Sequence, residues 1–242
     1  MIETVVVHPS RQSLSDAAAA RLVVALLDAQ SARGVAHVSL TGGSMGSHVV
    51  ASLGRVPARD AVDWSQVHVW WGDERYLPAG DADRNDTQND AAGLGALGLD
   101  PDKVHRVAGP DTTADAEESA RAYGDTLREN GVGSFDVMVL GVGPDGHVAS
   151  LFPFHPAAGT TGALAVAVHD SPKPPPVRVS LTRECLESSR EVWFVVSGSD
   201  KADALRRCVD GAPFESTPGA HVHGQERTLW LVDTDAAADL EG

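Results

Sequence analysis

Short runs of β-branched and aliphatic residues alternate along the chain with longer stretches in which apolar residues recur every three or four positions. The short runs are typical of buried strands and the longer stretches are typical of helices. Strands are predicted at residues 4–7, 37–40, 67–71, 135–140, 164–168, 177–181, 191–196 and 228–232. Helices are predicted from Ser13 to just before Gly34, and at residues 46–53, 86–97, 114–129, 199–209 and 234–240.

This alternation predicts an α/β fold built from βαβ units. We expect a mostly parallel, doubly wound open sheet with helices on both faces, which is Rossmann-like but lacks a dinucleotide site. The first helix has the clearest ends, with Ser13 as N-cap, Asp16 three residues later and Gly34 beyond its last turn. The proline-rich segment 170–176 has predicted strands on both sides, so residues 1–242 are interpreted as one domain.

Composition narrows the class of partner. The formal charge of −15 disfavours nucleic acid and anionic membranes, because both require clustered Lys and Arg. No apolar run approaches the roughly 20 residues that span a bilayer, and the first residues lack the features of a signal peptide, so we expect a cytoplasmic protein. The cysteines Cys185 and Cys208 have no metal or disulfide spacing and are predicted to be buried free thiols.

Three segments rich in glycine and charge follow predicted strands, at residues 41–46, 72–75 and 141–147. In an open α/β sheet, ligands bind at the carboxyl ends of the parallel strands, where loops and helix N-termini supply backbone N–H donors. We therefore expect these three segments to meet at one edge of the sheet and to form the functional site.

The first segment has three interpretations. As a phosphate cradle, its glycines bring backbone N–H groups close to an anion, and its hydroxyls add donors. The residues of this cradle are Thr41, Gly42, Gly43 and Ser44. The segment also fits the G-x-S-x-G elbow of serine hydrolases, with Ser44 as nucleophile, but the acid and histidine would come from unmarked choices such as Asp210 with His221 or His223. A plain tight turn is the third interpretation.

The third segment, 141–146, matches G-x-G-x-x-G formally. A dinucleotide fingerprint opens a long helix in the first βαβ unit, whereas this segment lies mid-chain and Pro153 follows soon after it. The segment instead offers His147, whose ordinary pKa of about 6.5 suits proton transfer near neutral pH, beside the carboxylate of Asp145. A histidine that only satisfies a loop hydrogen bond is the alternative.

Charged residues at the same predicted edge suggest an anion site. Asp73 and Arg75 follow a strand, Arg178 lies on a strand, and Lys201 lies in the first turn of a helix. A salt-bridged loop is the alternative for the segment 72–75. The ten histidines are scattered, and the close pair His221 and His223 lacks acids at ligand spacing, so no metal and no cofactor are expected.

At these residues the sequence resembles the 6-phosphogluconolactonase family, within the superfamily of glucosamine- and galactosamine-6-phosphate isomerases. The resemblance covers nearly the whole chain and rests on the ordered segments 39–44, 71–75, 135–153, 178–182 and 196–202. Related sugar-phosphate deaminases and isomerases share the Asp-Gly-His core at 145–147 but continue with Ala-Phe-Asn-Glu-Pro. This chain continues with Ala149-Ser150-Leu151-Phe152-Pro153 and has no acid there.

The resemblance implies metal-independent hydrolysis of a phosphorylated sugar lactone. We expect this small molecule as the partner, with no nucleic acid and no membrane, and we expect a monomer. The resemblance implies that His147 is the general base, that Asp145 orients it and that Arg75 stabilises the oxyanion or positions the substrate. It also implies that Gly42, Gly43, Ser44, Arg178 and Lys201 hold the 6-phosphate, with Thr41 and Asp73 alongside.

Two further points follow from the resemblance. The family usually has Thr-Pro where this chain has Met45-Gly46, so a side-chain donor is missing from the cradle. Two alternative functions remain, a sugar-phosphate deaminase or isomerase and a non-catalytic sugar-phosphate sensor. Known sensors of this kind carry an N-terminal helix-turn-helix, whereas here the first strand is predicted from Thr4.

Overall fold

The computed structural model describes residues 2–131 and 134–240. The strands are β1 (Ile2–His8), β2 (Ala36–Leu40), β3 (Val67–Trp71), β4 (Asp73–Arg75), β5 (Val137–Leu140), β6 (Ala165–Val168), β7 (Arg178–Leu181), β8 (Glu191–Val196) and β9 (Arg227–Asp233). The α-helices are α1 (Arg11–Arg33), α2 (Gly43–Leu53), α3 (Asn85–Ala91), α4 (Ala116–Glu129), α5 (Arg183–Glu187) and α6 (Ala202–Val209). No helix in these residues is long and apolar enough to cross a membrane.

The larger sheet has six parallel strands in the order β1-β9-β8-β5-β2-β3. After β2 the chain builds outward to β3, whereas after β5 it builds in the opposite direction through β8 and β9. The crevice between β2 and β5 is therefore the switch point, where ligands bind in folds of this kind.

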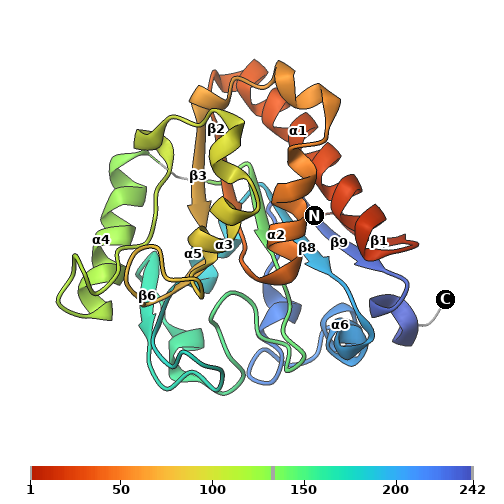
Figure 1. Ribbon diagram of the computed structural model, residues 1–242. Helices are drawn as coiled ribbons and strands as arrows, with labels where there is room; N and C mark the ends of the chain where they lie inside the picture. The colour runs from red at the N-terminus through yellow and green to blue at the C-terminus, as the bar shows by residue number, and fades with distance from the viewer. Residues whose placement is uncertain (1, 132–133, 241–242) are drawn as a thin grey trace.

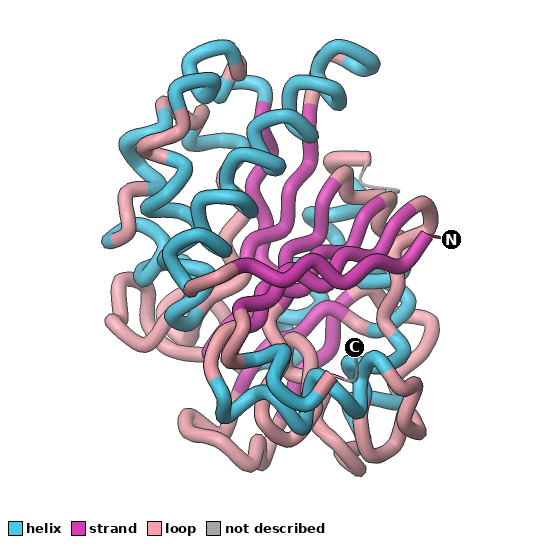
Figure 2. The backbone as a smooth tube through the Cα atoms, turned by 90° about the vertical axis from the view of Figure 1, so that its right-hand side faces the viewer, coloured by secondary structure: helices cyan, strands magenta, loops and turns pink. Residues whose placement is uncertain are grey.

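Helices cover both faces of this sheet (Figures 1 and 2). Along β5, Val137 and Val139 pack into the core beneath α1 and α2, while Met138 and Leu140 pack into the core beneath α4 and α5. Alternation of this kind buries both faces of a strand and makes it continuously apolar in sequence. The predicted α/β, doubly wound, mostly parallel fold is confirmed.

The smaller sheet differs from the prediction. It has three antiparallel strands in the order β4-β7-β6, so the strands predicted at 164–168 and 177–181 pair with each other rather than with the parallel sheet. Their third partner, β4, was expected to be a loop. A three-residue strand of Asp73, Glu74 and Arg75 has no apolar pattern, and it forms because β7 offers hydrogen-bond partners more than 100 residues further along the chain.

The helix ends also differ in places. Ser10, not Ser13, is the N-cap of α1, and its hydroxyl accepts from the N–H of Ser13 at 3.2 Å. Helix α2 begins at Gly43 rather than residue 46, and α3 ends at Ala91, before a separate 3₁₀ turn at Leu94–Leu97. The last predicted helix is a 3₁₀ turn at Ala236–Asp239. Cys185 and Cys208 are buried free thiols, as predicted.

Stacked rings occupy the amino end of β2 and β3. His37 stacks on His68 with ring centroids 4.4 Å apart, and His105 stacks on Trp70 at 3.7 Å. His68 and His105 are also joined through Nδ1 and Nε2 at 2.9 Å. Burial, together with the charges of neighbouring histidines, lowers the pKa of both His68 and His105 to about 4, so these rings are neutral near pH 7.

The outer edge of β3 is covered by the side chain of Tyr123 and by the loop that contains His105. The hydroxyl of Tyr123, from α4, accepts from the N–H of Trp71 at 2.9 Å and donates to its carbonyl at 3.0 Å. The N–H of His105 donates to the carbonyl of Val69 at 2.9 Å. These bonds satisfy backbone groups that an edge strand otherwise leaves free.

Candidate active site

The segments that follow β2, β3, β5 and β8 meet at the carboxyl edge of the large sheet, toward which the β3 arrow points in Figure 1. They enclose a cavity of about 340 Å³. The sequence-predicted residues that line it are Thr41, Gly42, Gly43, Ser44, Asp73, Arg75, His147, Arg178 and Lys201. Asp145 contacts the cavity through His147.

One wall is the start of α2. Gly42 is its N-cap, and a Cβ there would lie 1.7 Å from Oδ1 of Asn85, so the backbone approaches α3 more closely than a side chain permits. The first turn of α2 has no acidic residue, and its N–H groups carry the positive end of the helix dipole. One of these donors, the N–H of Gly43, is bonded to Oε1 of Gln88 at 3.1 Å. The rest of the turn resembles an anion cradle.

Ser44, the second residue of this helix, has no partner suited to activate it among the described residues. Among the described residues no side chain accepts a hydrogen bond from its hydroxyl, and His48 bonds only to its carbonyl oxygen. His221, suggested as part of an elbow triad, is bonded to the carbonyl of Ala212. The structure therefore offers no serine–histidine pair at Ser44 within its described part. Met45 packs into the core and also borders the cavity, and its thioether has no hydrogen-bond donor.

Strand β4 forms a second wall. Oδ2 of Asp73 accepts from the Ser150 hydroxyl at 2.5 Å, and Oδ1 accepts from Nδ2 of Asn85 at 3.2 Å. Arg75 donates to Oδ1 of the same asparagine. Asn85 thus holds an acid and an arginine on the cavity wall, and nothing in the predicted loop 72–75 pointed to it.

Glu74 points away from the cavity and fixes α3. Its carboxylate accepts from the N–H groups of Asn85 at 2.7 Å and Asp86 at 2.9 Å. Burial and the nearby charge of Asp86 raise its pKa to about 7, against the opposing effect of Arg84. The alternative of a salt-bridged loop therefore describes Glu74, whereas Asp73 and Arg75 face the cavity.

The loop after β5 presents the imidazole. Nδ1 of His147 lies 2.5 Å from Oδ1 of Asp145, so that nitrogen carries the proton and donates to the carboxylate. Among the described residues Nε2 has no hydrogen-bond partner, which leaves its lone pair available on the cavity side. Burial lowers the pKa of His147, although Asp145 acts to raise it. Near neutral pH the ring is a neutral base.

Packing fixes this ring. A Cβ on Gly143 would lie 2.0 Å from Cε1 and Nδ1 of His147, and the ring of Phe152 packs on it with centroids 4.6 Å apart. Burial acts to raise the pKa of Asp145, but the hydrogen bond from His147 and the charge of Lys173 lower this pKa by more than burial raises it, so the carboxylate stays ionised. Gly143 therefore serves the packing of His147.

Three cations complete the lining. Arg178, 5% exposed, donates through Nε to the carbonyl of Pro175 and through Nη2 to those of Lys173 and Pro174, and its Nη1 lies 3.9 Å from Oδ2 of Asp73. Lys201 lies 3.5 Å from the exposed Asp200. Lys173, which the sequence analysis did not select, lies 3.4 Å from Oδ1 of Asp145.

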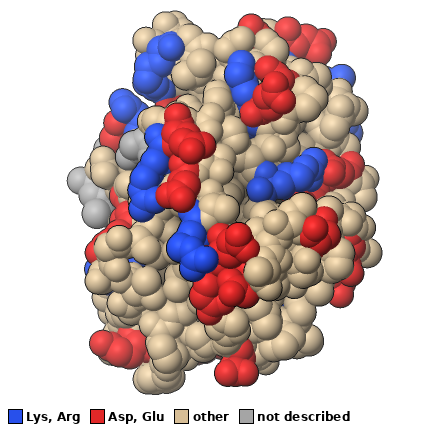
Figure 3. All heavy atoms as spheres, turned by 90° about the vertical axis from the view of Figure 1, so that its left-hand side faces the viewer, with Lys and Arg blue, Asp and Glu red and all other residues tan. Residues whose placement is uncertain are grey.

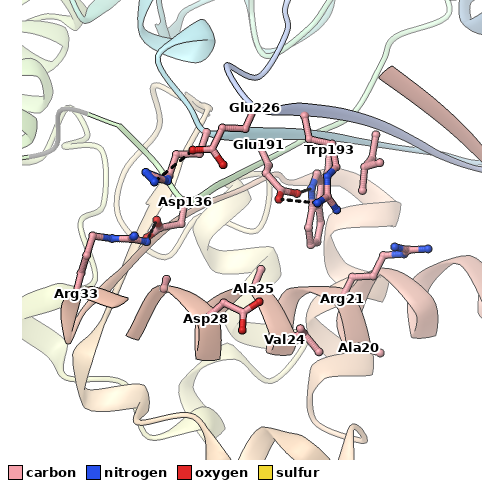
Figure 4. A pocket seen from close by; sticks show the side chains of 14 residues that line it. Ala20, Arg21, Val24, Ala25, Asp28, Arg33, Asp136, Glu191, Trp193 and Glu226 are labelled. Atoms are coloured by element: carbon pink, nitrogen blue, oxygen red, sulfur yellow. Dashed lines mark hydrogen bonds and ion pairs between the residues drawn. The ribbon is translucent and has the colours of Figure 1, made fainter. Parts of the chain in front are cut away.

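The charges of other surfaces are mixed. On the face shown in Figure 3, Lys and Arg lie beside Asp and Glu. A hollow of about 600 Å³ lies at the amino end of the strands, between α1 and the starts of β8 and β9. There Arg33 pairs with Asp136, Arg190 with Glu226 and Arg227 with Glu191 (Figure 4). Because these cations are paired, this hollow lacks the excess positive charge of the site cavity.

Metal ligands do not converge in the part of the chain that the structure describes. Within residues 2–131 and 134–240, no group of three or more His, Cys, Asp or Glu side chains is arranged to hold a metal ion. The chemistry available in the cavity is that of one imidazole–carboxylate pair beside a cluster of cations.

The fold and this cavity define an α/β protein with a cation-lined cavity at a helix N-terminus, next to an imidazole–carboxylate pair. The family model described as glucosamine-6-phosphate isomerases/6-phosphogluconolactonase matches residues 9–230, and the chain belongs to this family. Its relatives include a 6-phosphogluconolactonase of Streptomyces coelicolor, 48% identical over 244 residues that cover 97% of this chain and 94% of the relative.

Two further similarities agree. The 6-phosphogluconolactonase of Mycobacterium tuberculosis is 42% identical over 248 residues, with 99% of both chains covered. The solved structure of the 6-phosphogluconolactonase of Trypanosoma brucei superposes with a TM-score of 0.79 at 26% identity and covers 99% of each chain.

Proposed function

We propose that this chain hydrolyses 6-phospho-D-glucono-1,5-lactone to 6-phosphogluconate, the lactone-opening step of the oxidative pentose phosphate pathway. Full-length relatives that bear the name of this activity support the proposal. The observation that carries it is the His147–Asp145 pair, whose free Nε2 borders a cavity lined by cations.

In the proposed mechanism, Nε2 of His147 takes a proton from water as the oxygen attacks the lactone carbonyl. Asp145, which accepts from Nδ1, stabilises the imidazolium that forms. The negative charge that develops on the carbonyl oxygen is stabilised by Arg75. The imidazolium then protonates the ring oxygen as its bond to the carbonyl carbon breaks, which restores the neutral base.

The 6-phosphate is proposed to bind at the other side of the cavity. The first turn of α2, with Thr41, Gly42, Gly43 and Ser44, supplies N–H and hydroxyl donors, and Lys201 and Arg178 supply positive charge. Asp73 also lines the cavity and is proposed as a contact for the sugar. Positioning of water and lactone against a base supplies the catalysis, so no metal, cofactor or covalent nucleophile is required.

Two properties of the site favour a lactonase over a deaminase or isomerase. The position after Ala149 is Ser150, whose hydroxyl is buried against Asp73, and no acid follows in Leu151-Phe152-Pro153. In the related deaminases and isomerases a glutamate of this segment assists ring opening and proton transfer, whereas hydrolysis of a lactone does not require it. We place the reaction in the cytoplasm, because phosphorylated sugars are charged and do not cross membranes unaided, and we expect a monomer.

The test is acid release from freshly generated 6-phosphogluconolactone, followed at constant pH with the spontaneous rate subtracted. The wild-type chain should accelerate it, and His147→Ala should lose about 10²–10⁴-fold in turnover. The control is the thermal unfolding midpoint, which should change little because the ring borders a cavity. A His147→Ala variant that turned over at the wild-type rate would exclude this residue as the base.

A further inference from the structure

Lysine is rare in this chain. It has three lysines, Lys103, Lys173 and Lys201, against sixteen arginines, yet two of the three line the site cavity. Lys201 lies at the start of α6 and faces the phosphate side. Lys173 lies on the segment between β6 and β7 and approaches His147.

The ammonium of Lys173 contacts both members of the acid–base pair. Its Nζ lies 3.4 Å from Oδ1 of Asp145 and 3.2 Å from Nδ1 of His147. Since Nδ1 already donates to Asp145, it cannot accept from the lysine. The carboxylate therefore accepts from both the neutral imidazole and the ammonium, and the ammonium is held beside the protonated nitrogen of the imidazole.

The backbone of this segment is anchored at three successive carbonyls. The guanidinium of Arg178, which has only hydrogen-bond donors, donates to the carbonyl oxygens of Lys173, Pro174 and Pro175 at 3.1–3.2 Å. Ser171 also bonds the carbonyl and N–H of Lys173 through its hydroxyl. An exposed lysine is usually mobile, but here both the backbone on which it stands and the carboxylate that it contacts are fixed.

We propose that Lys173 is a positioning residue of the reaction, whose ammonium holds Asp145 and His147 in the arrangement that leaves Nε2 of His147 unprotonated. This inference rests on the proposed function, in which Nε2 is the proton acceptor. The proximity of a fixed positive charge disfavours a second proton on the ring, while the shared carboxylate prevents the ring from rotating.

The charges around the ring act in opposite directions. Asp145 and Asp73 favour the imidazolium, whereas burial and Lys173 disfavour it, with the net result that the pKa of His147 is lowered. Burial, Lys201 and Arg178 likewise lower the pKa of Lys173, against Asp145. Removing the Lys173 charge should therefore raise the pKa of His147, because its two carboxylate neighbours would act with less opposition.

The first test measures protonation without turnover. The imidazole Cε1–H resonance of His147 is identified as the signal missing from His147→Gln, and it is titrated by NMR in wild type and in Lys173→Met. Methionine keeps the length of the side chain, which is partly exposed, so the fold should be retained. The titration midpoint should move to higher pH in Lys173→Met and remain near the wild-type value in Lys103→Met. An unchanged or lowered midpoint in Lys173→Met overturns the proposal.

The second test uses the pH dependence of kcat/KM, which reports the ionisation of the free enzyme. In Lys173→Met the acid limb of the kcat/KM profile should move to higher pH. The value of kcat/KM should fall roughly tenfold at the acid end of the profile and change little at the alkaline end. Lys173→Arg should restore the wild-type limb. The matched control is Lys201→Met, which should raise KM for the phosphorylated lactone and leave the limb in place.

The two tests separate this inference from the function on which it rests. A loss of kcat/KM that is equal at every pH, with the limb unmoved, would make Lys173 a substrate ligand and overturn its role toward His147. Failure of the wild-type chain to open the lactone would refute the proposed function, and the NMR midpoints would still decide whether Lys173 sets the charge of the ring.

Discussion

The most direct test of how the site is built is Gly143→Ala. The added Cβ would lie 2.0 Å from Cε1 and Nδ1 of His147 and 2.5 Å from Oδ1 of Asp145. An ordinary contact begins at 3.4 Å, so the ring must move by about 1.4 Å. Phe152 packs on the ring, with centroids 4.6 Å apart, and limits the directions in which it can move. The substitution should therefore displace the base while leaving the sheet intact.

The expected loss follows from this displacement. A misplacement of about 1 Å in a reacting group costs on the order of 10²-fold in rate, which corresponds to about 2.7 kcal/mol in the activation free energy. The assay is acid release from fresh 6-phosphogluconolactone, measured beside the thermal unfolding midpoint. Gly159→Ala is the control, because a Cβ there meets no atom within 4 Å. If Gly143→Ala kept activity within threefold of wild type, the ring position would not govern the rate.

Three further outcomes are expected. Ser44→Ala should raise KM with little change in kcat, and a fluorophosphonate should not label Ser44, whereas covalent labelling there would restore the nucleophile interpretation. Lys201→Met should lower kcat/KM for 6-phosphogluconolactone by roughly 10- to 150-fold but leave that for gluconolactone unchanged, and equal losses on both would remove it from the phosphate site. The pKa of His105 in the folded chain is about 4, below the ordinary 6.5, so the unfolded chain binds more protons than the folded chain between these pH values. The free energy of unfolding should therefore fall as pH falls through this window, by at most about 3 kcal/mol from this residue. His105→Phe should flatten that slope in denaturant titrations, and an unchanged slope would assign it to other groups.

The sequence predicted the large sheet well, because its central strands, such as β5 and β8, are buried on both faces and are therefore apolar over most of their length. It did not predict that the strands near 164–168 and 177–181 form a second sheet, since an apolar run does not specify its partner. Strand β4 was missed because its three residues are polar and its pairing with β7 depends on a remote segment. At α1, Ser10 and Ser13 both suit an N-cap, and only the tertiary arrangement selects Ser10.

The candidate site shows the same division. Side chains in or beside the glycine-rich loops were predicted to be functional because these loops follow strands of the sheet. The cavity brings together the lining residues that were predicted in this way. Asn85 and Lys173 were not selected, because each reaches the cavity from a segment that follows no strand of the large sheet. The available signal for Lys173 was its rarity, since it is one of three lysines in the chain.

The covering of β3 by Tyr123 and His105 has a consequence for association between copies of the chain. An added strand needs a row of free N–H and carbonyl groups, and on this side Trp71 and Val69 have already committed theirs. At the opposite end of the sheet, β9 is the only strand within residues 2–131 and 134–240 that pairs with β1. A further strand can thus add to the sheet only beside β1. Charged substitutions along β1 should therefore increase resistance to aggregation.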